Sequence, residues 1–150
     1  MTLKVKAIEC VIFSTIKSPL FSDREIQEFI YFILRKLKVE GVLNIHCIGD
    51  ARMRSLNFRH RGKDTTTDVL TFPLSEGEVF FENLLPELGD IFISVPQIRR
   101  QARELGINPQ EEFVRMLIHG VLHSIGYDHM TKEDAEKMFG LQEKLLSQLV

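Results

Sequence analysis

Three of the five histidines in this 150-residue chain lie within one eleven-residue stretch, His119–His129. His119 and His123 are four residues apart, so a helix would place them one turn apart on the same face. Gly126 can end such a helix because glycine takes the left-handed conformation at little cost. The chain could then turn back and bring His129 to the same point. The spacing therefore predicts three imidazoles that converge at the end of a central helix.

Three imidazoles that leave one coordination position free are typical of catalytic zinc sites, whereas structural zinc sites are closed by four protein ligands. The stretch also matches the long zinc-protease motif H-E-x-x-H-x-x-G-x-x-H at its three histidines and its glycine. Gly120 stands where that motif has its general-base glutamate. We therefore predict one Zn²⁺ per chain at His119, His123 and His129, without the base of a peptidase. Ni²⁺ or another divalent ion would also suit three histidines.

The remaining histidines and the two cysteines are predicted to lie outside the metal site. His46 falls in an alternating, strand-like run, where a paired or exposed role is expected, and His60 is likewise predicted to be a non-ligand. Cys10 and Cys47 are far apart in the sequence and form no C-x-x-C pair, so we expect two buried free thiols. Neither a membrane-length apolar run nor a signal peptide is recognisable, which predicts a cytoplasmic protein.

The distribution of charge along the chain is more informative than the net charge of −2. Residues 1–63 carry twelve Lys and Arg against six Asp and Glu, whereas residues 64–150 carry seven against fifteen. Such asymmetry indicates a polyanion-binding half. An exposed helix face followed by a loop would give the same pattern without any ligand. The densest basic segment comprises Arg52, Arg54, Arg59, Arg61 and Lys63.

The spacing of apolar residues and the helix-start signals predict the order of the elements. Strands are expected at residues 4–13, 42–48, 67–73 and 87–94, with a further edge strand at Val79–Phe81 in a long loop. Helices are expected to begin at Ser22, at Asp50 as N-cap, at Ser94, at Asn108 and at Thr131. The pattern predicts a single domain over residues 1–150 of α+β class, α/β-like in character. Its helices would pack on a mixed, mostly four-stranded sheet.

Two further strings stand in order before the histidine motif. They are LN…RGKD…TDVLTFP, from Leu56 to Pro73, and LGDI, from Leu88 to Ile91. Together with HGVLHSIGYDH, from His119 to His129, these strings closely resemble the YbeY family of bacterial metallo-endoribonucleases. The resemblance covers about residues 50–130, while the first and last predicted helices fit the family only in general character.

The resemblance implies a single-strand-specific endoribonuclease that acts in 3′-end maturation of small-subunit ribosomal RNA and in ribosome quality control. It implies that His119, His123 and His129 hold the metal, and that Arg61 in the RGKD string is the family's functionally important arginine. The implied partners are single-stranded RNA, ribosomal RNA and the ribosome, with neither DNA nor a membrane among them.

These residue types suit RNA cleavage. Zinc held by three imidazoles can activate either a water molecule or the RNA 2′-hydroxyl and stabilise the phosphorane. The planar fork of Arg61 can hold a phosphate bidentately, although a loop arginine could instead pair with Asp64 or Asp68. Arg59, Arg61 and Lys63 are expected to bind the RNA backbone.

The sequence leaves the general base open. Asp128 neighbours a predicted ligand and could act as the base or instead orient a histidine. Asp68 and Asp90, each at the end of a predicted strand, are further candidates.

Two other functions would use the same motif. A metal-dependent hydrolase of peptides or small molecules would share the protease-like histidines, but Gly120 and the basic segment 52–63 argue against it. A ribosome assembly factor with a structural metal would need a fourth protein ligand, and no cysteine lies near the motif. Retention of the fold with loss of activity after metal removal would favour a catalytic metal.

Overall fold

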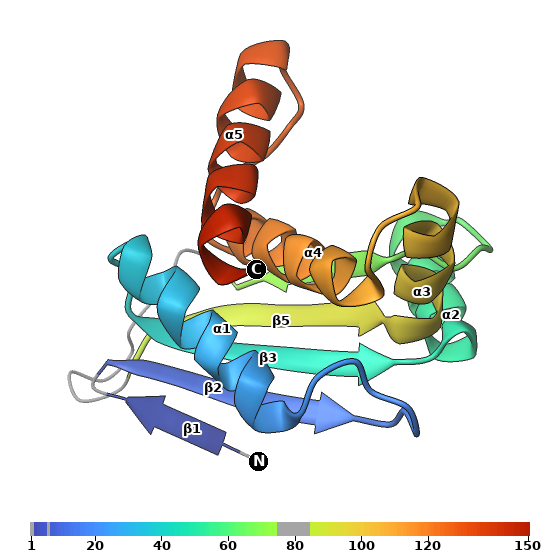
Figure 1. Ribbon diagram of the computed structural model, residues 1–150, viewed down its shortest axis with the longest axis horizontal. Helices are drawn as coiled ribbons and strands as arrows, with labels where there is room; N and C mark the ends of the chain where they lie inside the picture. The colour runs from blue at the N-terminus through green and yellow to red at the C-terminus, as the bar shows by residue number, and fades with distance from the viewer. Residues whose placement is uncertain (1, 6, 75–84) are drawn as a thin grey trace.

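The part of the chain that the computed structural model describes, residues 2–5, 7–74 and 85–150, forms five strands and five helices (Figure 1). The strands are β1 (Thr2–Val5), β2 (Ile8–Ser14), β3 (Gly41–Ile48), β4 (Val69–Pro73) and β5 (Glu87–Ser94). The helices are α1 (Asp23–Lys36), α2 (Asp50–Arg61), α3 (Val95–Leu105), α4 (Pro109–Ser124) and α5 (Lys132–Leu149).

The strands form one mixed sheet in the order β1-β2-β3-β5-β4. The three central strands β2, β3 and β5 are parallel, while β1 and β4 at the two edges run antiparallel to their neighbours. Parallel neighbours need crossover connections, and the chain supplies α1 between β2 and β3, and α2 with β4 between β3 and β5. This order places β4 at the edge beside the helix that carries the histidines.

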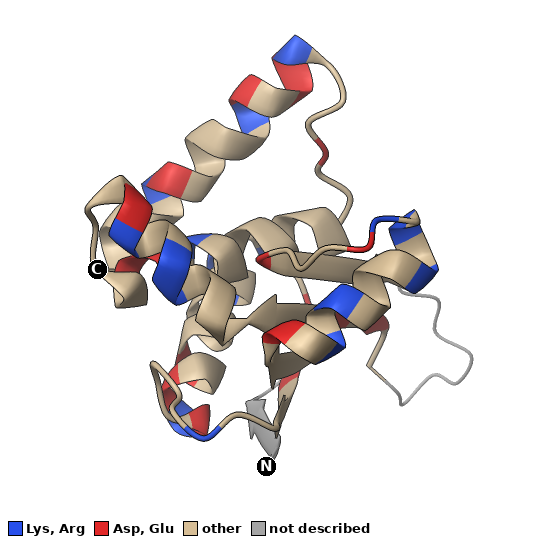
Figure 2. Ribbon diagram, turned by 90° about the vertical axis from the view of Figure 1, so that its right-hand side faces the viewer, with Lys and Arg blue, Asp and Glu red and all other residues tan. Residues whose placement is uncertain are grey.

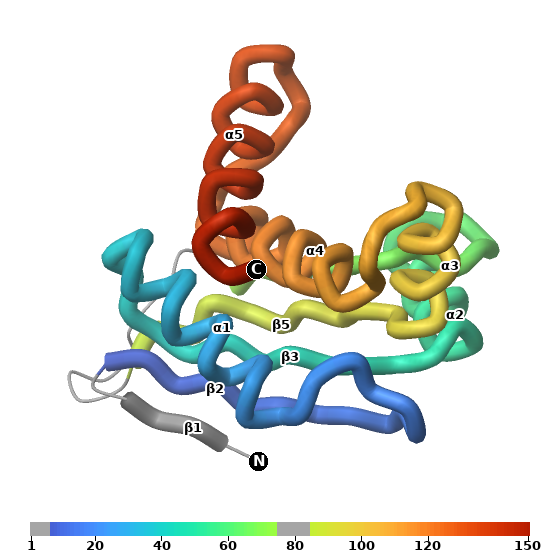
Figure 3. Tube along the Cα trace, in the orientation of Figure 1, coloured from blue at the N-terminus to red at the C-terminus, as the bar shows by residue number. Residues whose placement is uncertain are grey.

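One face of the sheet is covered by α1 and α4, which enclose the main hydrophobic core (Figures 1 and 3). Alternate strand residues such as Leu43, Ile45 and Ile91 point into this core and are fully buried. Phe113 of α4 is among the largest of the buried side chains. Burying each such side chain stabilises the fold by roughly 1.5–3 kcal/mol. The helix that carries two of the histidines is therefore held firmly against the sheet.

The last helix, α5, packs on α4 and rises away from the strands (Figures 1 and 3). Its residues Met138, Leu145 and Leu146 are buried in the main core. The opposite face of the sheet carries a smaller cluster, in which Met53 of α2 packs on Ile48 and Leu70. Both faces of the sheet thus help to position the cleft described below.

Four helices begin at the caps that the sequence predicts. Ser22 and Glu25 form a reciprocal capping box, with each backbone N–H donating to the other side chain at 3.1 Å. The side chains of Ser94, Asn108 and Thr131 cap α3, α4 and α5. Each cap satisfies a backbone donor that has no partner within the helix.

The predicted cap at Asp50 is wrong. Gly49 holds the N-cap position of α2 and Asp50 is its first residue. The Asp50 carboxylate instead accepts two bonds from Arg100, at 2.7 and 2.9 Å, and one from Ser94 at 3.0 Å. These bonds tie α2 to the start of α3, and the hydrogen bonds from Arg100 lower the pKa of Asp50.

The mixed sheet with packed helices agrees with the predicted fold, with one strand more than expected. Residues 2–5 and 8–14 form an antiparallel pair, where the alternation predicts a single strand. Cys10 and Cys47 are buried free thiols, and burial raises the pKa of each to about 12. The predicted edge strand Val79–Phe81 lies outside the described residues. Among the described residues, no helix is both long and apolar enough to cross a bilayer.

Candidate metal centre and catalytic cleft

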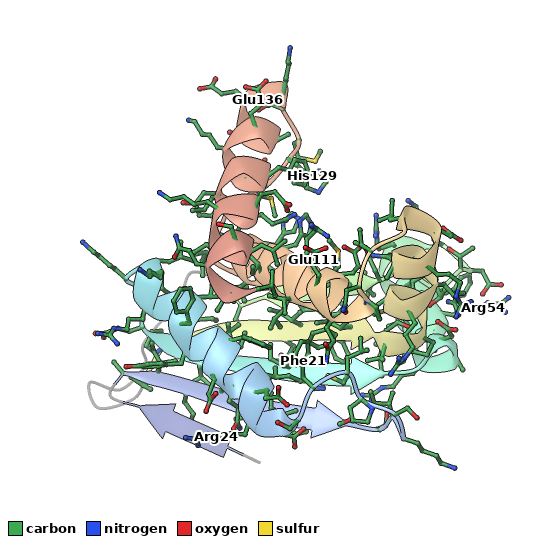
Figure 4. All side chains as sticks on the ribbon, in the orientation of Figure 1. Phe21, Arg24, Arg54, Glu111, His129 and Glu136 are labelled. Carbon is green, nitrogen blue, oxygen red and sulfur yellow. The ribbon has the colours of Figure 1, made fainter. Side chains whose placement is uncertain are left out.

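The C-terminal end of α4 brings the three motif histidines together. His119 and His123 lie in its last two turns, and the helix is followed by Gly126 with a φ of +109°. The Tyr127 N–H donates back to the Leu122 carbonyl at 3.0 Å, so the chain reverses at this glycine as predicted. His129 then follows in the connection to α5, and Figure 4 shows it beside α5 and above α4.

The three imidazoles converge. One ring nitrogen from each of His119, His123 and His129 lies within 4.8 Å of the other two, which is close enough for all three to bind one ion. The ring centroids are separated by 4.8, 5.2 and 5.7 Å. His119 and His123 are half-buried, whereas His129 is exposed. Among the described residues this is the one cluster of His, Cys, Asp or Glu that could hold a metal ion.

Two α5 side chains that the sequence analysis did not single out hold the histidines in place. The Nδ1 of His119 lies 2.8 Å from the Oε1 of the buried Gln142. An Nδ1–H that donates to this oxygen leaves the Nε2 lone pair free for a metal. The Phe139 ring stacks on both His119 and His129, with centroid separations of 6.0 and 5.8 Å. Neither residue belongs to a recognisable motif, because their role depends on how α5 packs on α4.

Burial favours the neutral form of two of the imidazoles. It lowers the pKa of His119 and of His123, and the neighbouring imidazoles act in the same direction, while the bond to Gln142 partly opposes the shift at His119. A neutral imidazole is the form that can bind a metal ion. The environment of the cluster therefore matches the needs of a three-histidine metal site.

At Gly120, α4 packs tightly against the sheet. A Cβ added there would lie 2.8 Å from the Ile91 Cγ2 and 3.3 Å from the Thr71 Oγ1. Real Cβ atoms essentially never have a neighbour closer than 3.0 Å. A glutamate at this position would point into the sheet instead of toward the histidines. The peptidase base is therefore absent from the sequence and has no room in the fold.

The histidines line one wall of a cleft of about 490 Å³. The facing wall consists of β4 and the segment before it, and Arg61 at the end of α2 completes the lining. Gly62 ends α2 with a φ of +71°, which turns the chain toward β4 directly after Arg61. The lining residues are Arg61, Thr67, Asp68, Val69, Leu70, Thr71, Pro73, His119, His123 and His129.

One side of α2 fastens the loop that follows Arg61. Arg54 holds Asp64 through two hydrogen bonds of 2.8 and 3.0 Å. The Asn57 side-chain amide donates to the Thr65 carbonyl at 2.8 Å, and Thr66 donates to Asp50 at 3.2 Å. Three consecutive loop residues are thus held by helix residues at successive turns, a group that we call the α2 clamp.

The two carboxylates considered as alternative partners for Arg61 are both bound by other side chains. Asp64 is occupied by Arg54, and Asp68 is held by Gln101 at 3.1 Å. Among the described residues, Arg61 makes no ion pair. A guanidinium without a carboxylate partner therefore lines the same cleft as the three imidazoles.

Comparison with known proteins identifies the family. The family model described as "Endoribonuclease YbeY" matches residues 15–150. The chain belongs to the endoribonuclease YbeY family. A relative from Sulfurihydrogenibium named "Endoribonuclease YbeY" is 44% identical over 78% of this chain and 76% of its own length. A second, from Persephonella marina, is 38% identical over 83% and 81%. The solution structure of TM1509 from Thermotoga maritima is 28% identical, with a TM-score of 0.68 over 93% of this chain and 88% of that one.

In this YbeY-family chain, the three candidate aspartates lie in different places. Asp68 lines the cleft, and its Oδ1 accepts the Val69 N–H at 2.7 Å. Asp128 lies outside the cleft lining, in a neighbouring hollow, where its Oδ1 accepts the Met130 N–H at 3.2 Å. Asp90 lies on the opposite face of the sheet, with its Oδ1 2.8 Å from the Nε2 of His46. Of these three aspartates only Asp68 lines the cleft, although the charge of Asp128 also acts on His123.

The two other basic residues expected to bind RNA lie near the cleft but outside its lining. Arg59 is exposed on α2 and Lys63 is exposed on the loop that follows it. Figure 2 shows Lys and Arg repeated along α2 and into this loop. The basic residues noted in the sequence thus recur along α2 and the loop after it, and Arg61 is the one among them that lines the cleft.

Proposed function

We propose that this protein is a metal-dependent endoribonuclease that cleaves single-stranded RNA. The observation that carries the proposal is the shared cleft, in which Arg61, which makes no ion pair with the described residues, lies with three convergent imidazoles. The chain's membership of the endoribonuclease YbeY family supports an RNA phosphodiester as the bond that is broken. Cleavage of this bond builds negative charge on the phosphate oxygens, and fixed cations stabilise that charge.

The donor set fits a metal ion. His119, His123 and His129 would hold it, with Gln142 fixing the ring orientation of His119. We favour Zn²⁺, because three imidazoles with an open position are typical of catalytic zinc. A bound ion of this kind supplies Lewis-acid chemistry to a phosphodiester.

Arg61 would bind the phosphate. Its guanidinium can donate two parallel hydrogen bonds to phosphate oxygens. Arg61 is the last residue of α2, and the α2 clamp fixes the loop that follows it, so the positive charge would be at the cleft before RNA binds. Removing one such donor from a preorganised site typically lowers the cleavage rate about 10²–10³-fold.

Asp68 is the best-placed residue to accept a proton. Asp68 lines the cleft, its charge acts on His119, and its carboxylate is oriented by Val69 and Gln101. We propose that it receives the proton of the attacking hydroxyl, from either water or the RNA 2′-hydroxyl. Asp128 would then act in the turn that positions His129, because its carboxylate bonds to the backbone of Met130.

The natural substrate that we propose is the 3′ region of small-subunit ribosomal RNA, bound on or near the ribosome in the cytoplasm. The family of the chain supports this choice. Selectivity for single strands follows if the cleft admits one backbone and excludes a duplex. We further propose that residues 1–150 act as one catalytic domain, with the RNA-backbone contacts supplied by Arg59, Arg61 and Lys63.

The test combines metal analysis with RNA cleavage. The purified protein should hold one metal per chain and cut single-stranded RNA, but not the same sequence in a duplex, and chelation should stop the cutting. His123→Ala should lose the metal and the activity while keeping the circular dichroism spectrum of a folded chain. Loss of the fold in this variant would instead indicate a structural metal.

A second variant tests the arginine. Arg61→Ala should retain the metal and lower the rate of RNA cleavage about 10²–10³-fold. Arg103→Ala, an exposed arginine on α3, is the matched control and should leave cleavage unchanged. Equal activity of wild type and Arg61→Ala would remove this residue from the mechanism. Metal binding without any RNA cleavage would refute the proposed function.

A further inference from the structure

The sheet face opposite the metal site carries a row of stacked rings. Phe13 of β2, His46 of β3 and Phe92 of β5 lie side by side in register on neighbouring strands. The centroids of Phe13 and His46 are 4.7 Å apart with planes 10° from parallel. The ring centroids of His46 and Phe92 are 4.1 Å apart, and their planes are 11° from parallel. These three residues, which we call the aromatic row, form one continuous stack across the sheet.

A hydrogen bond holds the middle ring in place. The Nε2 of His46 lies 2.8 Å from the Asp90 carboxylate on the next strand, and its side chain is only 13% exposed. The imidazole therefore cannot rotate without losing both this bond and its two stacking partners. The row is consequently preorganised, and little side-chain entropy would be lost when another ring stacks on it.

The row is open at the Phe13 end. Phe13 is 47% exposed. The pairing of β1 with β2 extends only as far as Thr2 and Val11, so among the described residues no strand lies beside Phe13 on its outer side. An exposed ring face at the end of a stack is a surface on which a nucleobase can continue the stacking.

Cations border the other end of the row. The Arg52 guanidinium lies 5.7 Å from the Phe92 ring centroid. Arg59 follows seven residues later, which places it on the same side of α2 two turns further along. Within the described part of the chain neither arginine makes an ion pair. Both are therefore available to phosphate groups.

The carboxylates on this face lie toward the starts of the strands. Asp90 bonds to His46, and the pKa of Glu87 is raised by burial and by the nearby charges of Asp90 and Glu9. Glu87 and Glu9 would repel a phosphate backbone, whereas the Asp90 carboxylate is bonded to the His46 ring within the row. A bound polyanion would therefore cross the sheet near α2, along the aromatic row, and not near the starts of the strands.

The aromatic row is connected to the cleft around the edge strand β4. Thr71 and Pro73 line the cleft, while Phe72 between them faces the other side of the sheet. There the Phe72 ring contacts Phe92 at 5.6 Å and His60 at 4.6 Å. A single RNA strand that leaves the cleft beside Arg61 would meet this surface after passing one strand of the sheet.

We propose that the aromatic row, together with Arg52 and Arg59, is a second binding surface for single-stranded RNA. It takes nucleotides that flank the cleaved bond, with a base stacked on Phe13 and phosphates at the two arginines. This inference rests on the proposed endoribonuclease function and adds a substrate-binding surface distant from the metal. RNA fits better than an apolar partner, because the row has an exposed ring at one end and, at the other, two arginines that make no ion pair with the described residues.

The test compares RNA lengths. Fluorescently labelled single-stranded oligonucleotides of about 4 and about 16 nucleotides, the range of known single-strand site sizes, are titrated into chelator-treated protein to prevent cleavage. Phe13→Ala should weaken binding of the long RNA about tenfold, as expected for loss of one base–aromatic stack, and leave the short RNA unchanged. Arg52→Ala should weaken binding of the long RNA but not of the short RNA, and should reduce the salt dependence of long-RNA binding.

Matched variants separate stacking from apolar contact. Phe13→Tyr should bind long RNA like wild type, whereas Phe13→Leu should bind like Phe13→Ala. Phe32→Ala, which removes a ring from α1 that also has a lysine nearby, should have no effect. With metal restored, the same Phe13 variants should raise the KM for long RNA and leave cleavage of short RNA unchanged.

The outcomes distinguish this surface from the proposed function. Unchanged affinity for long RNA in Phe13→Ala and Arg52→Ala would overturn the inference, and the face would then be better explained as a docking site for a protein. Equal weakening by Phe13→Ala of both RNA lengths would also overturn it, because the short RNA should occupy only the cleft. A wild-type protein that binds both RNAs but cleaves neither would refute the endoribonuclease function instead.

Discussion

The close approach of α4 to the sheet at Gly120 makes a quantitative prediction. An alanine Cβ would lie 2.8 Å from Ile91 Cγ2, whereas carbon atoms prefer separations of about 3.5–4.0 Å. The helix or Ile91 must therefore move by about 0.7–1.2 Å, and such overpacking costs about 1–3 kcal/mol. Alanine is also favoured over glycine in a helix by about 1 kcal/mol. We expect Gly120→Ala to destabilise the fold by a net of about 0–2 kcal/mol.

Gly140 supplies the matched control. It lies within α5, and an added Cβ would meet nothing within 4 Å. Gly140→Ala should therefore stabilise the fold by about 1 kcal/mol, the preference of a helix for alanine over glycine. The difference between the two variants isolates the packing cost. Urea unfolding measures this difference in the free energy of unfolding directly. In thermal unfolding, each kcal/mol of difference should shift the Tm by about 2–4 °C in a chain of this size.

Two results would contradict a close contact between Gly120 and Ile91. If both alanine variants stabilise the protein equally, α4 does not approach the sheet as closely as the 2.8 Å contact requires. The second test is a double-mutant cycle with Ile91→Ala, which removes the contacted methyl group. Gly120→Ala should cost less in that background than in the wild type, and additive effects would refute the contact.

Two further predictions concern residues that support the site. Gln142→Leu removes the acceptor from His119 and should weaken metal affinity about 10–100-fold in a chelator competition, whereas Gln148→Leu on the same helix should not. The hydrogen bonds from Arg100 lower the pKa of Asp50 in the folded state. This carboxylate therefore stabilises the fold at pH values above its unfolded-state pKa of about 3.9. The stabilisation is lost as the pH falls through the lower folded-state pKa. Asp50→Asn should therefore be less stable at neutral pH and show a shallower loss of stability in acid, which urea titrations over a pH series would measure.

The ligand cluster could be predicted from the sequence because it is local. Helical spacing fixes His119 and His123, and the glycine turn returns His129 only six residues later. Gln142 and Phe139 could not be found in this way, because they reach the histidines only through the packing of α5 on α4. A periodic pattern shows which face of a helix is apolar, but it does not show which distant polar group will lie opposite.

Two features of the fold show the same limit. The turn between β1 and β2 has no Gly, Pro, Asn or Asp between Thr2 and Ser14, so turn chemistry gives no signal and the alternation continues through it. Aspartate is a residue type that favours the N-cap position, yet the Asp50 carboxylate accepts hydrogen bonds from Arg100, fifty residues later. In both cases long-range pairing outweighs the local preference that a sequence displays.

The α2 clamp has a consequence for the thermodynamics of RNA binding. Three consecutive loop residues are fixed by one helix before any substrate arrives. The conformational entropy of ordering the backbone next to Arg61 is therefore lost when the protein folds and not when RNA binds. Docking of a phosphate at Arg61 should consequently carry a small ordering penalty from the protein, and most of the entropy lost on binding should come from the RNA strand itself.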